Sequence, residues 1–134
     1  MDRYAQAAVA GDMDALAETL TADVELVSPL SGRMVFRGRE ELRVLLGVVY
    51  GSLRELRWEE PIRDGSRVVV LGESHVGWTR RSDVTVFELA ADGRIQRIRP
   101  FIRPWLGLTV DALVVGPKML RHLPVLWRAL RAGG

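Results

Sequence analysis

The chain has 134 residues, of which 48% are hydrophobic and 27% charged, and its formal net charge is +2. This length suits one domain with its own core, and the lack of cysteine excludes disulfides, thiol chemistry and cysteine-ligated metal sites. No apolar run reaches the ~18 residues of a membrane-spanning helix, and the first residues lack the pattern of a signal peptide. We therefore expect a cytoplasmic protein.

The basic residues are spread along the chain and form no stripe except on the strand face that carries Arg97, Arg99 and Arg103. Eighteen of the nineteen are arginines, and nucleic-acid binding would need them clustered, preferably beside aromatic stacking platforms. The two histidines, His75 and His122, are far apart and have no carboxylates at ligand spacing. We expect no nucleic-acid partner, no metal and no cofactor.

The first half of the chain predicts two helical regions and two short strands. Gly11 interrupts the first helical region, and Asp12 can cap its second piece. In chain order the predicted elements are a helix over 2–20, a turn over 21–23, a strand over 24–28 stopped by Pro29, a brief strand over 34–36 and a helix over 38–50.

The second half predicts long strands. Residues 53–62 place Leu56, Trp58 and Ile62 on one side, the Asp64–Gly65 pair signals a hairpin, and a further strand covers 67–79. Residues 83–103 then form a hairpin around Ala90-Ala-Asp-Gly93. The predicted fold class is α+β, with helices on the concave side of one curved sheet.

The two strands of the 83–103 hairpin have faces of different character, because successive side chains of a strand point to opposite sides. One face is largely apolar with a few polar groups, and the other is cationic. The first face carries Asp83, Thr85, Phe87, Leu89, Gln96, Ile98, Pro100 and Ile102, and the second carries Arg97, Arg99 and Arg103. The pattern is typical of one half of a pocket-forming sheet.

Four motifs, in this order and spacing, carry a family resemblance. They are Tyr4 eight residues before Asp12, Ala-Asp-Val-Glu-Leu-Val-Ser-Pro over 22–29, Arg-Gly-Arg-Glu over 37–40, and Phe-Glu-Leu-Ala-Ala-Asp-Gly-Arg-Ile over 87–95. Over residues 1–103 the chain resembles the SnoaL-like and ketosteroid-isomerase-like branch of the nuclear transport factor 2-like superfamily. The resemblance implies a cone-shaped α+β barrel with an apolar pocket. Beyond it we expect residues 104–134 to form a helical extension that packs on the same domain.

The same resemblance implies activities and an assembly. Members include steroid isomerases, polyketide cyclases, epoxide hydrolases and many proteins without a known reaction, and they are commonly dimeric through the outer sheet face. We therefore expect a homodimer formed by the face that carries Arg97 and Arg99.

The residues of the steroid isomerases carry over only in part. The family's helix-1 tyrosine falls on Tyr4, its catalytic base on Ser28 and its second acid on Thr85. A serine hydroxyl is too weak a base to remove a proton from carbon, and a general base contributes about 10²–10⁴ in rate. The resemblance thus predicts no steroid-isomerase activity.

Two other family patterns are also incomplete. The limonene-epoxide-hydrolase pattern has an Arg-x-Asp pair on the strand that corresponds to 67–79, an aspartate on the last strand and an asparagine. In this chain the pair falls on Gly72 and Ser74, the last-strand aspartate on Pro100 and the asparagine on Ser28. The SnoaL cyclases use a histidine and a last-strand aspartate, but residues 94–103 contain no carboxylate.

Several residues remain as site candidates. Tyr4 and Asp83 are the candidate catalytic residues, Asp83 because it should share the inner face with Thr85; the alternative is a solvated acid at a hairpin end. Glu73 and His75 share a strand face and could form an acid/base pair in the pocket; the alternative, which follows from the register with Gly72, Ser74 and Val76 inside, places them on the outer face. The predicted ligand-binding residues are Tyr4, Ser28, Trp58, Ser74, Trp78, Thr85, Phe87, Ile98, Pro100 and Ile102.

The tail departs from the family pattern. It predicts an apolar helix ended by Gly116–Pro117, and then a basic amphipathic segment in which Pro124 starts a fresh turn. The apolar side of that segment consists of Leu120, Leu123, Trp127 and Leu130. Three roles stay open for the tail: a lid over the pocket, a dimer contact, or a membrane-surface anchor.

These observations predict a pocket for an apolar or polycyclic small molecule. The protein is expected to be an enzyme or enzyme relative of unknown reaction, with isomerases, cyclases and epoxide hydrolases among its relatives. The alternatives are a non-catalytic small-molecule-binding protein, which the missing carboxylates favour, and a dimeric interaction module.

Overall fold

The computed structural model describes residues 1–132, apart from the side chains of residues 106 and 107. The helices are α1 (Asp2–Ala10), α2 (Met13–Glu18), α3 (Arg39–Gly51), α4 (Trp105–Met119) and α5 (Leu123–Ala132), with a 3₁₀ turn (Leu120–His122) between the last two. The strands are β1 (Leu20–Val27), β2 (Val35–Arg37), β3 (Leu53–Trp58), β4 (Ile62–Asp64), β5 (Arg67–Val76), β6 (Thr79–Leu89) and β7 (Ile95–Arg103).

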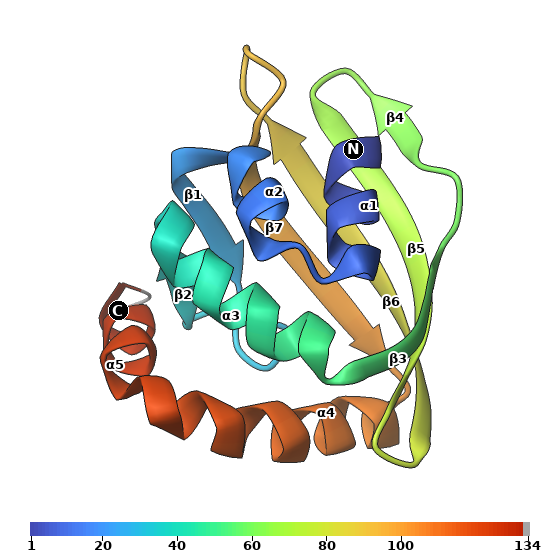
Figure 1. The fold of residues 1–134 in the computed structure, drawn as a ribbon, viewed down its shortest axis with the longest axis vertical. Coiled ribbons are helices and arrows are strands. Elements are labelled where there is room, and N and C mark those ends of the chain that lie inside the picture. Colours follow the sequence, from blue (N-terminus) through green and yellow to red (C-terminus); the bar gives the residue numbers. More distant parts are fainter. Residues whose placement is uncertain (133–134) are drawn as a thin grey trace.

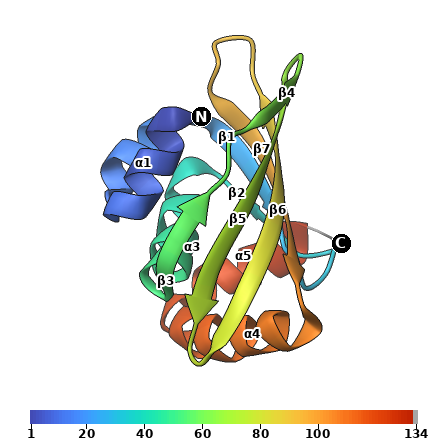
Figure 2. The same cartoon turned by 90° about the vertical axis from the view of Figure 1, so that its right-hand side faces the viewer.

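The strands form one curved, unclosed sheet in the order β2-β1-β7-β6-β5-β3, with β4 paired to β5. All pairs are antiparallel except β1 with β7. Helices α1, α2 and α3 lie on the concave side of the sheet, and α4 crosses its lower end (Figures 1 and 2). The predicted α+β class is confirmed.

The N-terminal helices break where the sequence predicts. Gly11 ends α1 with φ of 72°, and an Asp12 carboxylate oxygen accepts a hydrogen bond from the Ala15 amide at 3.0 Å. The predicted end at residue 20 is wrong, however. Leu20 is fully buried and already paired with Ile95 of β7, so strand β1 begins there instead of after a turn.

The predicted strand over 53–62 is interrupted. β3 ends at Trp58, and Ile62 belongs to the separate strand β4, where it is 62% exposed instead of buried. Glu55 has φ of 54° and coincides with a register shift between β3 and β5. Pro61 lacks the N–H that would continue a ladder, so the inward alternation stops before Ile62.

A two-residue turn between β5 and β6 sets the register of the inner face. Val76 pairs with Thr79, and Gly77 has φ of 55°, which leaves Gly77 and Trp78 as the turn. The prediction of a strand through residue 79 with Trp78 in the pocket is therefore wrong: Trp78 is 75% exposed. Beyond the turn, alternate residues from Thr79 to Phe87 face inward.

The tail folds differently from its prediction. α4 does not end at Gly116 but continues through Pro117 to Met119. Pro117 and Leu113 are both exposed, so the carbonyl freed by the proline lies on the solvent side of the helix. α4 packs against α3, β5, β6 and β7, and α5 packs against β2 (Figure 1).

The tail also presents a different face to the core. The predicted apolar side, Leu120, Leu123, Trp127 and Leu130, is exposed. The tail residues that join the core are Met119, Val125 and Ala129. Helical spacing makes both faces apolar, and the packing of α5 on β2 determines which one is covered.

Candidate functional site

A cavity of about 240 Å³ lies between the helices and the concave face of the sheet. Its walls are mostly apolar and come from every layer of the fold. The sheet contributes Leu26, Leu56 and Ile98, helix α3 contributes Leu46, and the tail contributes Val115 and Leu126. The tail therefore forms part of the wall.

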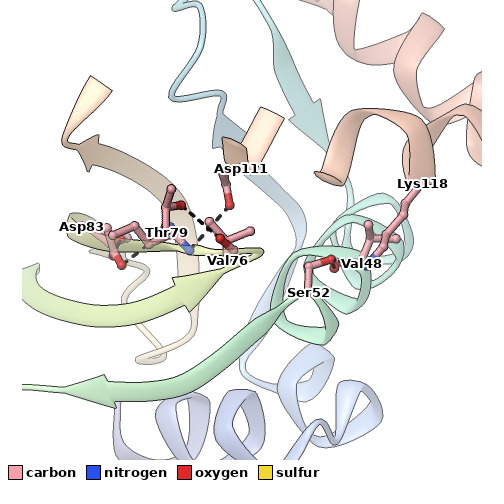
Figure 3. A network of polar contacts seen from close by, with 9 residues as sticks. Val48, Ser52, Val76, Thr79, Asp83, Asp111 and Lys118 are labelled. Atoms are coloured by element: carbon pink, nitrogen blue, oxygen red, sulfur yellow. Dashed lines mark hydrogen bonds and ion pairs between the residues drawn. The ribbon is translucent and has the colours of Figure 1, made fainter. Parts of the chain in front are cut away.

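Three charged side chains line one part of this cavity and lie close together; Figure 3 labels two of them, Asp83 and Asp111. Arg81 of β6 lies between two aspartates: its Nη2 is 3.7 Å from Asp83 Oδ1, and its Nη1 is 3.9 Å from Asp111 Oδ1. The three side chains are only 5%, 10% and 11% exposed, respectively. We call Arg81, Asp83 and Asp111 the carboxylate–arginine cluster.

Local structure explains how the cluster is assembled. Arg81 and Asp83 are two residues apart on β6, so both point inward. Asp83 is paired with Gly72 on β5, and a Cβ atom at Gly72 would lie 2.9 Å from Asp83 Oδ1. A glycine on the neighbouring strand thus provides the space for the Asp83 carboxylate. Asp111 comes from the middle of α4, which crosses this end of the sheet.

The two carboxylates have different surroundings. Thr85 Oγ1 donates a hydrogen bond to Asp83 Oδ2 at 2.9 Å. Asp111 Oδ1 is buried without a hydrogen-bond partner among the described residues, as are Arg81 Nε and Nη1. Buried polar atoms of this kind are rare in folded proteins and are suited to a polar group of a bound molecule.

Burial raises the pKa of Asp111 above its ordinary value of 3.8. Desolvation is the largest cause, the Arg81 guanidinium opposes it, and the negative charge of Asp83 adds to it. The protonated form of Asp111 is therefore favoured to a higher pH than in an exposed aspartate.

A second polar group consists of two tyrosines. The hydroxyls of Tyr4 and Tyr50 are 2.7 Å apart, and both residues line the cavity. Burial is the largest cause that raises the pKa of each hydroxyl, so both stay neutral. The Tyr4 ring packs edge-on against Phe87 and Trp58, with centroids 5.1 and 6.0 Å away. Trp58 Nε1 is buried without a hydrogen-bond partner among the described residues.

The structure brings most of the predicted site residues together. Those that line the cavity are Tyr4, Ser28, Trp58, Asp83, Thr85, Ile98, Pro100 and Ile102. Ser74 and Phe87 are buried but are not among the cavity-lining residues. Trp78 lies in the exposed turn. Glu73 and His75 lie on the outer face, where Glu73 contacts Arg80 and His75 Nδ1 is 3.6 Å from Glu55.

The residues that sequence reasoning missed are Arg81, Tyr50 and Asp111. The inward direction of Arg81 depends on where the β5–β6 turn falls. The Arg81-Ser82-Asp83 spacing is a usable signal, but it lies outside the strand on which the Arg-x-Asp pattern was sought. Asp111 carries no local signal, because only the packing of α4 brings it to Arg81.

A curved, open sheet around helices, with ionisable groups in an apolar cavity between them, defines a domain of the nuclear transport factor 2-like, or cystatin-like, fold. The chain belongs to the family of SnoaL-like domains, whose model matches residues 1–98. No curated protein matches the sequence.

Solved structures share this architecture. An uncharacterised protein with a cystatin-like fold from Silicibacter pomeroyi DSS-3 superposes with a TM-score of 0.88 at 19% identity, covering 96% of this chain and 92% of that chain. A steroid delta-isomerase from Pseudomonas aeruginosa gives 0.83 at 20% identity, covering 92% and 90%. SalBIII, an epoxide hydrolase/cyclase-like enzyme with a role in pyran ring formation in the polyether salinomycin, gives 0.61 at 26% identity, covering 78% and 92%.

Proposed function

We propose that this protein is an acid–base enzyme that opens an epoxide on an apolar small molecule, with either water or a hydroxyl of the substrate as the nucleophile. The observation that carries the proposal is the carboxylate–arginine cluster: two buried carboxyl groups on either side of one buried guanidinium, in an otherwise apolar cavity. Pairs of acids with different surroundings are the usual basis for dividing the roles of acid and base.

The different surroundings of the two acids support different roles in the proposed reaction. Asp83, which accepts the hydrogen bond from Thr85, acts as the base and removes a proton from the attacking O–H group. Asp111, whose protonated form is favoured by burial, acts as the acid and donates a proton to the epoxide oxygen. One carbon–oxygen bond forms and one breaks. The cluster then holds its proton on Asp83 instead of Asp111, and exchange with solvent restores the starting state.

Arg81 positions the two acids. Its Nη atoms point to different carboxylates, so one rigid side chain determines the separation of base and acid. Its unpaired buried N–H groups are also suited to hydrogen-bond an oxygen of the substrate. Arg81 therefore supports both proton-transfer steps without itself exchanging a proton.

The similarities to known proteins support this choice. The limonene-epoxide-hydrolase pattern consists of an Arg-x-Asp pair plus a second aspartate. In this chain Arg81 and Asp83 of β6 and Asp111 of α4 supply those residue types. SalBIII is described as epoxide hydrolase/cyclase-like. Isomerase chemistry is less well supported, because Ser28 at the base position only accepts a hydrogen bond from the Leu30 amide at 3.2 Å.

The test is a screen of the purified protein against terpene epoxides and hydroxy-epoxides, with diols and cyclic ethers identified by mass spectrometry. We expect turnover above background that Asp111→Asn removes and that Asp92→Asn, a change at an exposed loop carboxylate, leaves unchanged. A Δ5-3-ketosteroid should not be isomerised. Ligand binding without turnover of any epoxide would favour the non-catalytic binding protein, and native mass spectrometry of freshly expressed protein would reveal a co-purified ligand.

The pH profile provides a further prediction. The proposed acid must be protonated, so kcat should fall as the pH rises through the raised pKa of Asp111. Because desolvation raises this pKa, the fall should occur above the pH range in which an exposed aspartate titrates. A rate that rises with pH throughout the stable range would contradict Asp111 as the acid.

We also propose a homodimer through the outer face of the sheet. Leu71, Val84 and Phe101 are neighbours on three adjacent strands, and charged residues flank them, including Glu88 paired with Arg99 at 3.4 Å. Sedimentation should give a dimer, which Phe101→Arg dissociates and which Ile62→Arg, at an exposed position on β4, leaves intact. A monomer at micromolar concentration would contradict this assembly.

A further inference from the structure

The outward side of the C-terminal tail is apolar. Leu120, Leu123, Trp127 and Leu130 are each between 54% and 60% exposed. Their spacing of three or four residues places them along one side of a helical segment. We call these four residues the outer stripe. The core-facing side of the same segment is occupied by Val125 and Ala129, so more than half of the surface of each outer-stripe residue stays exposed in the part of the chain that the structure describes.

The surroundings of the outer stripe are cationic. Residues 112–132 include Lys118, Arg121, Arg128 and Arg131 and contain no acidic residue. Arg128 forms an ion pair with Glu41 of α3, and Lys118 donates to Ser52 at 2.7 Å. Arg131 lies over the Trp127 ring, 5.1 Å from its centroid. Neither Arg121 nor Arg131 forms an ion pair with any described residue.

We propose that this tail docks on an anionic bilayer surface, with the outer stripe in the headgroup region and Arg121 and Arg131 against lipid phosphates. Amphipathic segments with tryptophan and leucine on one side and arginine beside them bind in this way. No helix among the described residues is long and apolar enough to cross a membrane, so the contact is peripheral.

Charge decides between a bilayer and a second copy of this chain as the occupant. Two tails facing each other would bring together only cations, because the segment supplies no carboxylate to pair with them. Such like-charge contacts oppose association. An anionic lipid surface instead complements the arginines and accepts the leucines and the indole ring.

The position of the tail connects this surface to the cavity. Val115, Met119 and Leu126 line the cavity from the inner side of the same tail. Gly116, which also lines the cavity and is exposed, lies in α4. Docking of the tail therefore places this wall of the cavity beside the bilayer, where apolar molecules concentrate.

The test is co-sedimentation of the full chain with vesicles of phosphatidylcholine containing phosphatidylserine, and with vesicles of phosphatidylcholine alone. We expect binding to the first that is at least about tenfold stronger than to the second and that weakens in high salt. Arg121→Gln with Arg131→Gln should reduce binding by about fivefold per cation. The matched control, Arg63→Gln with Arg67→Gln, changes two exposed arginines of the β4–β5 hairpin at the other end of the molecule (Figure 1) and should not.

Trp127→Ala provides the second arm. Because its ring is 60% exposed, the substitution should leave the melting temperature unchanged while it lowers vesicle binding, and Ile62→Ala should change neither. Absence of binding to the anionic vesicles, or equal binding by Trp127→Ala and the unmodified protein, would overturn the proposal. Conversion of a dimer to a monomer by Trp127→Ala without vesicles would show that a second copy covers the outer stripe.

Discussion

Asp83→Asn is expected to lower kcat/KM for an epoxide substrate by about 10²–10⁴, the usual contribution of a general base. The amide keeps the size and shape of the carboxylate and can still accept a hydrogen bond from Thr85 Oγ1, but it cannot take a proton from the attacking O–H group. Binding of the substrate should change little, because the apolar walls of the cavity are untouched.

The control for this variant is Asp64→Asn, which changes an exposed aspartate at the end of β4 and should leave activity unchanged. Thermal melts accompany both variants, because loss of activity through unfolding must be separated from loss of the base. An Asp83→Asn protein that is folded and retains full turnover would show that Asp83 is not the base.

Arg81→Met is expected to destabilise the protein by about 3–5 kcal/mol at neutral pH. The arginine side chain is 5% exposed and faces two buried carboxyl groups. Its removal leaves Asp83 and Asp111 without a compensating charge, and each must then be ionised in an apolar cavity or keep its proton. Breaking a buried pair in this way costs far more than losing a surface ion pair.

Arg80→Met is the matched control. Arg80 precedes Arg81 on the same strand and pairs with Glu73, but the two side chains are 67% and 48% exposed. Its loss should cost at most about 1 kcal/mol. The two variants differ only in which face of β6 they alter, so their difference measures the burial of the cluster and not the intrinsic preference of methionine for a strand.

The stability deficit of Arg81→Met should depend on pH, and the pKa of Asp111 determines the sign of that dependence. A buried acid whose pKa is raised in the folded state binds more protons than in the unfolded state, so stability falls as the pH rises through that pKa. The pKa of Asp111 is already raised, and removal of Arg81 takes away the charge that opposes the shift. The stability deficit of Arg81→Met should therefore shrink as the pH is lowered toward the unfolded-state pKa of the aspartates. Chemical denaturation over a pH series measures it, and a deficit independent of pH would contradict this electrostatic explanation.

Structural elements that are determined by residues close together in the sequence were predictable from it. Gly11 and Asp12 define the break between α1 and α2, since a left-handed residue and a cap act on the helix ends beside them. The inward direction of Asp83, Thr85 and Ile98 follows from strand alternation together with the need to bury apolar surface. The family motifs belong to the same local level, which is why the α+β class and eight of the cavity-lining residues, including Tyr4 and Trp58, were predicted.

The tertiary structure decided what chemistry that cavity holds. Arg81 faces inward because the β5–β6 turn falls at Gly77 and Trp78. The same turn places Trp78 at the surface. Asp111 reaches Arg81 from 30 residues along the chain because α4 packs across the end of the sheet. The outer stripe faces solvent because α5 covers β2 with its other side. Helical and strand periodicity indicates which residues share a face. Only contacts between segments far apart in the sequence determine which face is buried and which charged side chains come together there.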